Sequence, residues 1–434
     1  MLSTRLEFAP ERDAGIFRSL PAAPAVFLLR GKGEAGGEPY VSKTANLRRR
    51  LARLLGAGEE RTRKLNLRDR VSTIDYQTTG SDFESGFVLY QVLRREFPRS
   101  YRDRLRLRPA PLVKLNLENP YPRAHVTRRI GRMASRSRYY GPFASRAAAE
   151  KFLNDSLDLF RHRRCADDLN PDPAFPGCIY SEMKMCLAPC FKGCTDEEYA
   201  RETERVRQFL ESGGESLRRE LSAERDRASA ALQFEQAAAV HARIEKAASA
   251  MALRPDVARP LDRLHGLMVQ PSAAPDAVSL FRIDGGFISG PIVFSVGATT
   301  EAAINPRGDA AGNISPPQAE AAQKPSSSIA KPKPSQPKSM ESRVADALAA
   351  APAGAPSSAL ELMEHLAILR RWYFRTSKTG ELFLAEPNGE LPMRRIVRGV
   401  SRVFRGEKPA PDLNESARDY WINRGKEAEI RGSE

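Results

Sequence analysis

The chain has 434 residues, 41% of them hydrophobic but only 7% aromatic, so its length allows two to four domains with modest cores. No apolar run approaches the roughly 20 residues of a membrane span, which excludes a membrane protein and predicts a cytoplasmic one without structural disulfides. The net charge of +15 favours a polyanionic partner, DNA or RNA, although a solvated basic surface is the alternative.

Residues 15–105 predict a compact α+β domain. The expected elements are strands at 25–30 and 39–43, a helix at 44–56, a strand at 70–79 and a helix at 82–97. The first helix shows the pattern most clearly, because its leucines recur at helical spacing and Gly56 follows as a stop signal.

Two segments are unusually rich in arginine. Residues 94–108 contain seven arginines and two acids, and residues 123–138 contain six arginines and no acid. Guanidinium groups bind phosphate in a bidentate manner, and the interleaved aromatic side chains can stack on bases. We therefore expect these segments to bind nucleic acid, with Arg128, Arg129 and Arg132 as the leading candidates.

The rest of the chain changes composition in steps. We expect an Arg-rich and Cys-rich segment at 121–200, a helical hairpin at 201–251 and a segment at 262–298 that contains a strand, a Gly-rich turn and a second strand at 278–296. A disordered linker at 299–358 follows, and then a helix, a short strand and a loosely held tail at 359–434. The linker is predicted from its Ala, Pro, Ser and Gln content, which cannot form a core.

All five cysteines lie in one part of the chain. Cys178, Cys186 and Cys190 follow one another closely, with Cys165 upstream and Cys194 just downstream. Four thiolates from one segment suit a tetrahedral zinc site or an iron–sulfur cluster, because four metal–sulfur bonds must converge. The spacing leaves zinc and iron–sulfur both open, and Cys194 could replace Cys165.

A family resemblance appears around these cysteines. The sequences "YYGPFASRAAAEKFLNDSLDLFRHRRC" and "GCIYSEMKMCLAPC" closely resemble the central region of UvrC, the incision subunit of bacterial nucleotide excision repair. The resemblance implies a [4Fe-4S] cluster on Cys165, Cys178, Cys186 and Cys190, and it leaves Cys194 outside the pattern.

Residues 221–247 resemble the UVR motif, a helical hairpin through which UvrC meets a similar hairpin of UvrB. One apolar stripe includes Phe234, Ala238, His241 and Ile244 at three- and four-residue steps. The resemblance implies that this stripe binds a UvrB-type partner. On pattern alone, an ordinary intramolecular hairpin explains it equally well.

The N-terminal sequence "SLPAAPAVFLL…PYVSKTANLRRRL" is similar to the start of a GIY-YIG nuclease domain. This similarity implies a phosphodiesterase site of Tyr40, Lys43, Arg50 and Glu84, with Glu84 holding Mg²⁺ or Mn²⁺. Phe27 replaces the first tyrosine of the motif and Ser42 replaces a glycine. Losing a general acid or base commonly costs about 10²–10⁴-fold in rate, so we expect a degenerate site.

The family continues into an RNase H-like domain and helix-hairpin-helix motifs, of which residues 262–298 match only the approach. The sequence therefore predicts a shortened UvrC-like DNA-repair protein with weak or no nuclease activity. Two alternatives stay open: an active endonuclease that makes a single incision, and a non-catalytic adaptor or regulator of the excinuclease complex.

Overall fold

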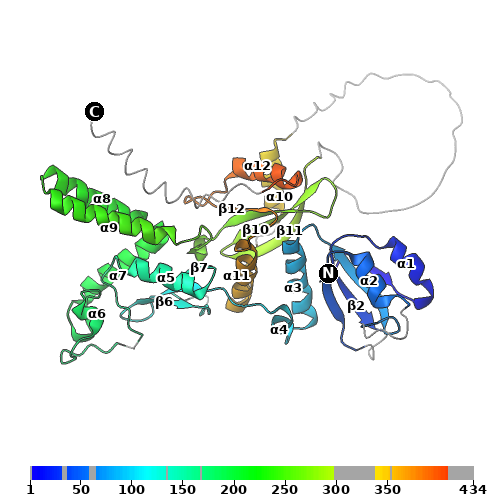
Figure 1. Ribbon diagram of the computed structural model, residues 1–434, viewed down its shortest axis with the longest axis horizontal. Helices are drawn as coiled ribbons and strands as arrows, with labels where there is room; N and C mark the ends of the chain where they lie inside the picture. Colours follow the sequence, from blue (N-terminus) through cyan, green and yellow to red (C-terminus); the bar gives the residue numbers. More distant parts are fainter. Residues whose placement is uncertain are drawn as a thin grey trace, which may run out of the picture.

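The structure is a computed structural model that describes residues 2–31, 37–57, 65–132, 135–166, 169–297, 338–351 and 354–408. It contains three four-stranded antiparallel sheets with helices packed around them, as the predicted α+β class requires. Figure 1 shows the N-terminal unit at one end, the C-terminal sheet in the middle and a helical hairpin projecting at the other end. No helix in these ranges is long and apolar enough to cross a bilayer.

The N-terminal unit is a sheet in the order β1-β4-β2-β3. Its elements are β1 (Thr4–Glu7), η1 (Pro10–Arg12), α1 (Asp13–Ser19), β2 (Ala25–Gly31), β3 (Tyr40–Thr44), α2 (Leu47–Leu55) and β4 (Val71–Thr78). The predicted strand–strand–helix–strand order is observed, and α2 buries all four of its leucines. Strand β1 was not predicted; it pairs with β4, and Arg5 bonds Asp75 across that pair at 2.6 Å.

Two helices follow this sheet: α3 (Asp82–Glu96) and α4 (Tyr101–Leu105). Helix α3 belongs to two cores at once. Val88 and Val92 pack in a cluster with β2, whereas Phe83 and Phe87 meet Phe281 edge-on, at ring-centroid distances of 4.9 and 5.8 Å. The predicted domain boundary at residue 105 therefore does not separate two independent cores.

The middle unit is a sheet in the order β6-β5-β7-β8. Its elements are β5 (Leu112–Asn116), β6 (Arg123–Thr127), β7 (Arg138–Gly141), α5 (Arg146–Leu157), α6 (Ile179–Glu182), η3 (Pro189–Phe191), α7 (Asp196–Ser212) and β8 (Arg259–Pro260). Helices α5 and α7 share one core with the sheet, centred on Phe143, Phe152 and Phe209. The cysteines lie in the segment that connects α5 to α7.

Helices α8 (Glu215–Ala230) and α9 (Phe234–Ala252) form the projecting hairpin. Gly213 and Gly214 have φ values of 66° and 85°, so they end α7 and let the chain turn into α8. Only the base of the hairpin joins the core of the middle unit.

The C-terminal unit is a sheet in the order β11-β10-β9-β12. Its elements are η4 (Leu261–Arg263), β9 (Gly266–Pro271), β10 (Ala277–Asp284), β11 (Phe287–Ser295), α10 (Met340–Ala350), α11 (Ala359–Tyr373), β12 (Glu381–Leu384) and α12 (Met393–Phe404). Helix α11 packs in one core with the sheet and α3, while α10 and α12 pack in a second core with other residues of the same strands. The sheet is thus covered on both faces.

Three predictions about this region need correction. The expected linker at 299–358 is too long, because Met340–Ala350 is a helix with Val344 fully buried. The expected loose tail contains α12, which buries Ile396 and Val400. Residues 262–298 and the C-terminal helix and strand form one unit, since β12 pairs with β9. Most of the linker and the last 26 residues, 409–434, lie outside the described ranges.

Candidate functional site

The cysteine segment bridges α5 and α7 with little regular structure. Cys178 is the N-cap residue of α6 and Cys190 lies in the 3-10 turn η3. Cys186 is buried, whereas the other four cysteines are half-buried. Arg123 of β6 donates to the carbonyl oxygen of Cys165 at 3.4 Å, which ties this end of the segment to the middle sheet.

The backbone of this segment is unusual near Cys186. Lys184, Ala188 and Lys192 have φ values of 56°, 59° and 57°, in the left-handed region that side chains with a Cβ rarely adopt. The amide of Ala188 donates to the Sγ of Cys186 at 3.3 Å. A donor aimed at sulfur favours the thiolate, so this bond partly offsets the effect of burial on Cys186.

Three of the thiols lie near the fourth, Cys186. Burial is the main reason that the pKa of Cys186 rises to about 11, and charge on Cys165, Cys190 and Cys178 adds to the rise. Burial and then Cys178 likewise raise the pKa of Cys190. Burial also raises the pKa of Cys194, but there the next contributions come from acidic residues of α7. Cys194 therefore lies to one side of the group.

The group fits a thiolate-bound metal by chemistry but does not yet have the geometry of one. Buried thiols that repel one another's ionisation stay protonated unless a cation offsets the negative charge. Soft sulfur ligands suit zinc and iron–sulfur centres. In the described part of the chain, no three His, Cys, Asp or Glu side chains have the arrangement of a metal site. Binding would need the side chains to close together.

The nuclease-like residues Tyr40 and Arg50 do meet. Arg50 Nη2 donates to the hydroxyl of Tyr40 at 3.0 Å, and the ring of Phe27 lies 6.1 Å from the ring of Tyr40. Phe27 is fully buried and faces Ser42 across the β2–β3 pair. Where the resemblance implies a tyrosine hydroxyl, the structure has a buried apolar ring.

Glu84 does not join this group. It is buried, with 4% of its surface exposed, and accepts hydrogen bonds from the Gly80 amide at 2.9 Å and the Ser279 hydroxyl at 3.4 Å. Lys43 instead pairs with Asp82 at 2.5 Å. Residues two apart on a helix point about 200° apart, so Glu84 faces away from the side of α3 that meets Lys43.

The predicted role of Glu84 as the holder of a divalent ion beside Tyr40 therefore does not fit the structure. Burial raises the pKa of Glu84, and its two hydrogen bonds only partly offset that effect. Asp82 could not simply replace Glu84 as the residue that holds a divalent ion. Burial alone would raise the pKa of Asp82, but Lys43 and Arg375 lower it below its ordinary value. Asp82 is thus already neutralised by two cations of the chain itself.

The apolar stripe predicted on α9 mostly faces outward. Phe234 is 65% exposed, and Ala238 and His241 are also exposed, while Ile244 is half-buried. The face of α9 that packs inside the molecule consists instead of Val240, Ala247, Ala250 and Met251. An intramolecular hairpin alone does not cover the stripe.

The candidate arginines Arg128, Arg129 and Arg132 lie in the segment that follows β6, and all three are exposed. None of them has a carboxylate partner within the described ranges. Arg370 of α11 lies near this segment, because the charge of Arg128, after burial, lowers the pKa of Arg370. Arg370 was not predicted; the only sequence signal for it is the basic pair in "LRRWYF".

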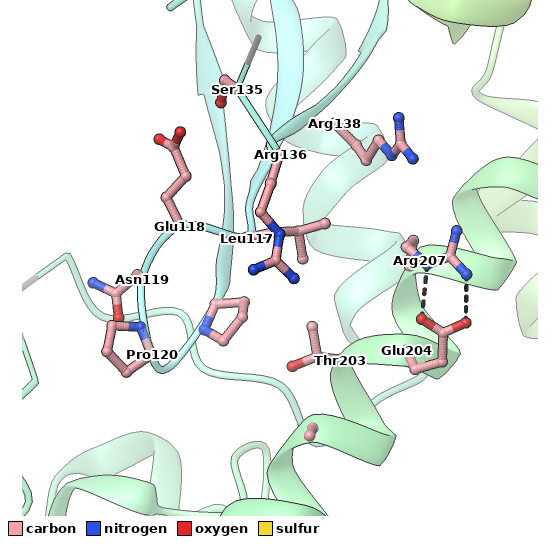
Figure 2. A pocket seen from close by; sticks show the side chains of 12 residues that line it. Leu117, Glu118, Asn119, Pro120, Ser135, Arg136, Arg138, Thr203, Glu204 and Arg207 are labelled. Carbon is pink, nitrogen blue, oxygen red and sulfur yellow. Dashed lines mark hydrogen bonds and ion pairs between the residues drawn. The ribbon is translucent and has the colours of Figure 1, made fainter.

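A pocket of about 790 Å³ lies between the turn after β5 and helix α7. Figure 2 shows Arg136 pointing into it toward Thr203, and Arg207 bonded to Glu204 on its far wall. The Oγ1 atom of Thr203 is buried without a hydrogen-bond partner in the described structure. Two of its lining residues, Arg136 and Arg138, belong to segment 123–138, which the sequence predicts to bind nucleic acid.

Comparison with known proteins places the middle unit in a family. Residues 110–209 match the family model described as UvrC/Cho excinuclease, middle domain. This range contains β5, β6, β7, α5, the whole cysteine segment and nearly all of α7.

Relatives match about half of this chain. UvrABC system protein C of Acidobacterium capsulatum is 35% identical over 227 residues, which is 51% of this chain and 34% of that protein. The proteins of the same name from Rickettsia bellii and Sphingopyxis alaskensis are 26% and 29% identical, over 56% and 54% of this chain and 36% and 37% of their own lengths. The matched part thus spans about a third of these relatives. No solved structure matches.

Proposed function

We propose that this chain works in nucleotide excision repair by binding DNA and a UvrB-type partner. Residues 110–209 match the model of the UvrC/Cho middle domain, in agreement with the resemblance to UvrC. The match of the middle domain is the observation that carries this proposal. The high positive charge and the exposed arginines after β6 support the DNA part of it, since unpaired guanidinium groups are suited to phosphates.

The partner site we propose is the outer face of the α8–α9 hairpin. Leu232 and Phe234 are 73% and 65% exposed at its tip, which is an unusual position for large apolar side chains. A second helical hairpin of complementary shape would bury them. This is the helix-to-helix mode of recognition in which a few apolar anchors supply most of the affinity.

The cofactor we propose is a [4Fe-4S] cluster on Cys165, Cys178, Cys186 and Cys190. The grouping of these four thiols around Cys186, with Cys194 to one side, supports that ligand set over the one that includes Cys194. When bound, such a cluster supplies a compact cross-link with electron-transfer capacity. The protein's own part is to supply the sulfurs and to hold them by the backbone around Ala188.

We propose further that the GIY-YIG-like unit has no robust nuclease activity. Phe27 cannot supply a hydroxyl, and Glu84 is held inside the molecule by Gly80 and Ser279. This geometry favours a DNA-binding adaptor over the alternative of an enzyme that makes a single incision with Mg²⁺ or Mn²⁺.

One reconstitution tests both parts. The full chain is mixed with UvrB, a damaged duplex and Mg²⁺ or Mn²⁺, and both complex formation and strand nicking are measured. We expect a complex without nicking. Phe234→Ala should abolish capture of UvrB, because losing an aromatic anchor typically costs over ~2 kcal/mol. Phe404→Ala is the matched control, since Phe404 is another exposed phenylalanine, on α12.

Two results would contradict the proposal. Equal capture of UvrB by wild type and Phe234→Ala would remove the hairpin as the partner site. Robust nicking by the wild type that Glu84→Ala eliminates would show that the unit is an enzyme after all.

A further inference from the structure

The two arginine-rich segments that stand out in the sequence come together on α11. A groove of about 650 Å³ has the segment 99–109 as one wall, and its floor includes Leu360, Met363 and Ala367 of α11. The amide of Ile130 donates to the Sδ atom of Met363 at 3.2 Å. The segment after β6 therefore lies against the same helix, at a residue that also lines the groove.

Arg370 lies on the same helix as the floor of this groove. Met363, Ala367 and Arg370 are four and three residues apart, so they share one face of α11. The Nε and Nη2 atoms of Arg370 donate to the carbonyl oxygen of Ala144 at 3.0 and 2.8 Å. This anchoring fixes the guanidinium, and neither bond neutralises its charge.

The groove collects positive charge that the chain does not balance. Four exposed arginines line the groove, and three more are exposed on the neighbouring segment after β6: Arg99, Arg102, Arg106 and Arg108 in the groove, and Arg128, Arg129 and Arg132 beside it. In the described ranges none of these seven forms an ion pair. Two carboxylates line the groove, Asp103 and Glu364. Glu364 is buried and already accepts hydrogen bonds from Tyr90 and Tyr101.

The charges crowd most closely around Arg370. Burial, and then the charges of Arg128 and Arg108, lower the pKa of Arg370. These residues come from three separate parts of the chain: the segment after α4, the segment after β6, and α11. Like charges that converge from separate elements are unfavourable on their own, and an anion between them offsets the repulsion.

We propose that this groove binds one strand of nucleic acid, with its phosphates at Arg108, Arg128 and Arg370 and its bases against the apolar floor of α11. The inference rests on the DNA binding proposed above and assigns it a place and a form. A single strand fits better than a duplex, because its unpaired bases can lie on Leu360 and Met363, whereas paired bases are hidden in a stack. Leu360 is 38% exposed and available for such a contact.

The test compares two triple variants of the full chain. The groove variant carries Arg108→Gln, Arg128→Gln and Arg370→Gln. The control carries Arg394→Gln, Arg395→Gln and Arg398→Gln, which removes the same charge from exposed positions on α12. Binding of a fluorescent oligothymidine strand, and of a duplex of the same length, is measured by anisotropy over a range of salt concentrations.

We expect the groove variant to bind the single strand roughly tenfold more weakly at low salt, with a log–log salt slope smaller by about 2, since each lost phosphate contact removes about 0.7 from the slope. The control should change both quantities much less. If the triple variant does not fold, an Arg108→Gln, Arg128→Gln double variant takes its place, because it keeps the Arg370–Ala144 contact. The double variant should lose less affinity for the single strand than is expected of the triple variant, and more than the control loses.

Equal losses in the groove variant and the control would overturn the inference, because binding would then follow net charge alone. A loss confined to the duplex would also overturn it. Wild-type chain that binds neither probe would instead contradict the proposed DNA binding as a whole, so the two failures are distinguishable.

Discussion

Single side chains decide what the N-terminal unit can do. Phe27 lies in the core with Leu29 and Ile74, so an apolar ring there satisfies the packing while removing a hydroxyl. Glu84, in contrast, keeps its polar group, but its carboxylate bonds Ser279 of β10 and so connects α3 to the C-terminal sheet. It does not pair with Lys43, which pairs with Asp82. In both cases the side chain packs well in the fold and does not take the role that the resemblance to GIY-YIG nucleases implies.

The cysteines give the sharpest prediction at this scale. Replacing Cys165, Cys178, Cys186 or Cys190 singly with Ser should lower the iron content and the broad absorbance near ~400 nm of protein prepared without oxygen, because four thiolates must converge on the cluster. Cys194→Ser is the matched control and should retain both. Metal analysis and visible spectroscopy check this.

Loss of iron in Cys194→Ser with retention in Cys165→Ser would reverse the ligand assignment. One zinc and no iron in the wild type would replace the cluster with a zinc site.

At the scale of elements, the buried carboxylate of Glu364 on α11 is an important contact with α3 and α4. Glu364 accepts hydrogen bonds from Tyr90 at 2.9 Å and Tyr101 at 2.5 Å, and its own helix is held to α3 by the Arg94–Glu361 ion pair. The two hydroxyls lie 263 or more residues away in the chain. These two hydrogen bonds therefore join the N-terminal and C-terminal parts of the chain.

Glu364→Ala should lower the free energy of unfolding by about 3–5 kcal/mol, because two buried hydroxyls lose their acceptor and a cavity opens. Glu364→Gln keeps an acceptor oxygen and should cost less. Glu341→Ala on α10, an exposed position, is the control and should change stability little. Urea unfolding measures all three, and equal stability of Glu364→Ala and Glu341→Ala would show that the carboxylate does not hold the two helices together.

The elements predicted correctly from the sequence are those with a local pattern. The leucines of α2, the Gly285–Gly286 turn between β10 and β11, and the helical hairpin all follow from neighbouring residues. Helix α10 was missed because it has few large apolar residues, and only Val344 and Leu348 become buried. Its stability comes from the core that it joins, which local composition does not reveal.

The candidate sites show the same difference between local sequence patterns, which can be predicted, and long-range contacts, which cannot. The cysteine grouping could be predicted because its residues are close in sequence, and the charges of Cys165, Cys178 and Cys190 all act on Cys186 in the structure, while the ligand set itself stays a prediction. The position of Glu84 could not, because its partner Ser279 lies 195 residues away. Arg370 was likewise invisible, since only the fold brings it beside Arg108 and Arg128.

In the whole molecule, α11 is the element that connects the C-terminal sheet, helix α3 and the middle unit. It packs with the C-terminal sheet through Leu366 and Leu369, bonds α3 through Glu364, and reaches the middle unit through the Arg370–Ala144 contact. Figure 1 shows it beneath the C-terminal sheet, beside α3. A helix in this position can bring the two arginine segments together only while all three units are folded.

The free energy of unfolding should depend on pH through His365, which also lies on α11. His365 is 3% exposed, accepts a hydrogen bond from the Ile288 amide at 2.9 Å and stacks on Phe287 at 4.3 Å. Burial lowers the pKa of His365 from 6.5 to about 4. The unfolded chain therefore binds the proton first as pH falls, so stability is full above pH ~6.5 and is lost between about 6.5 and 4, by up to roughly 3 kcal/mol.

His365→Phe should flatten this part of the profile, because a phenyl ring keeps the packing and cannot take a proton. Above pH ~6.5 it should also lower stability by about 1 kcal/mol, since the Ile288 amide loses its acceptor, and this deficit should shrink or reverse as the pH falls and the wild type loses stability. Some pH dependence should persist, because burial also lowers the pKa of His162 to about 4 in the middle unit. Urea midpoints measured from pH 7.5 down to 4.5 distinguish the two contributions. Parallel profiles for wild type and variant would mean that His365 is not the group whose protonation loosens α11.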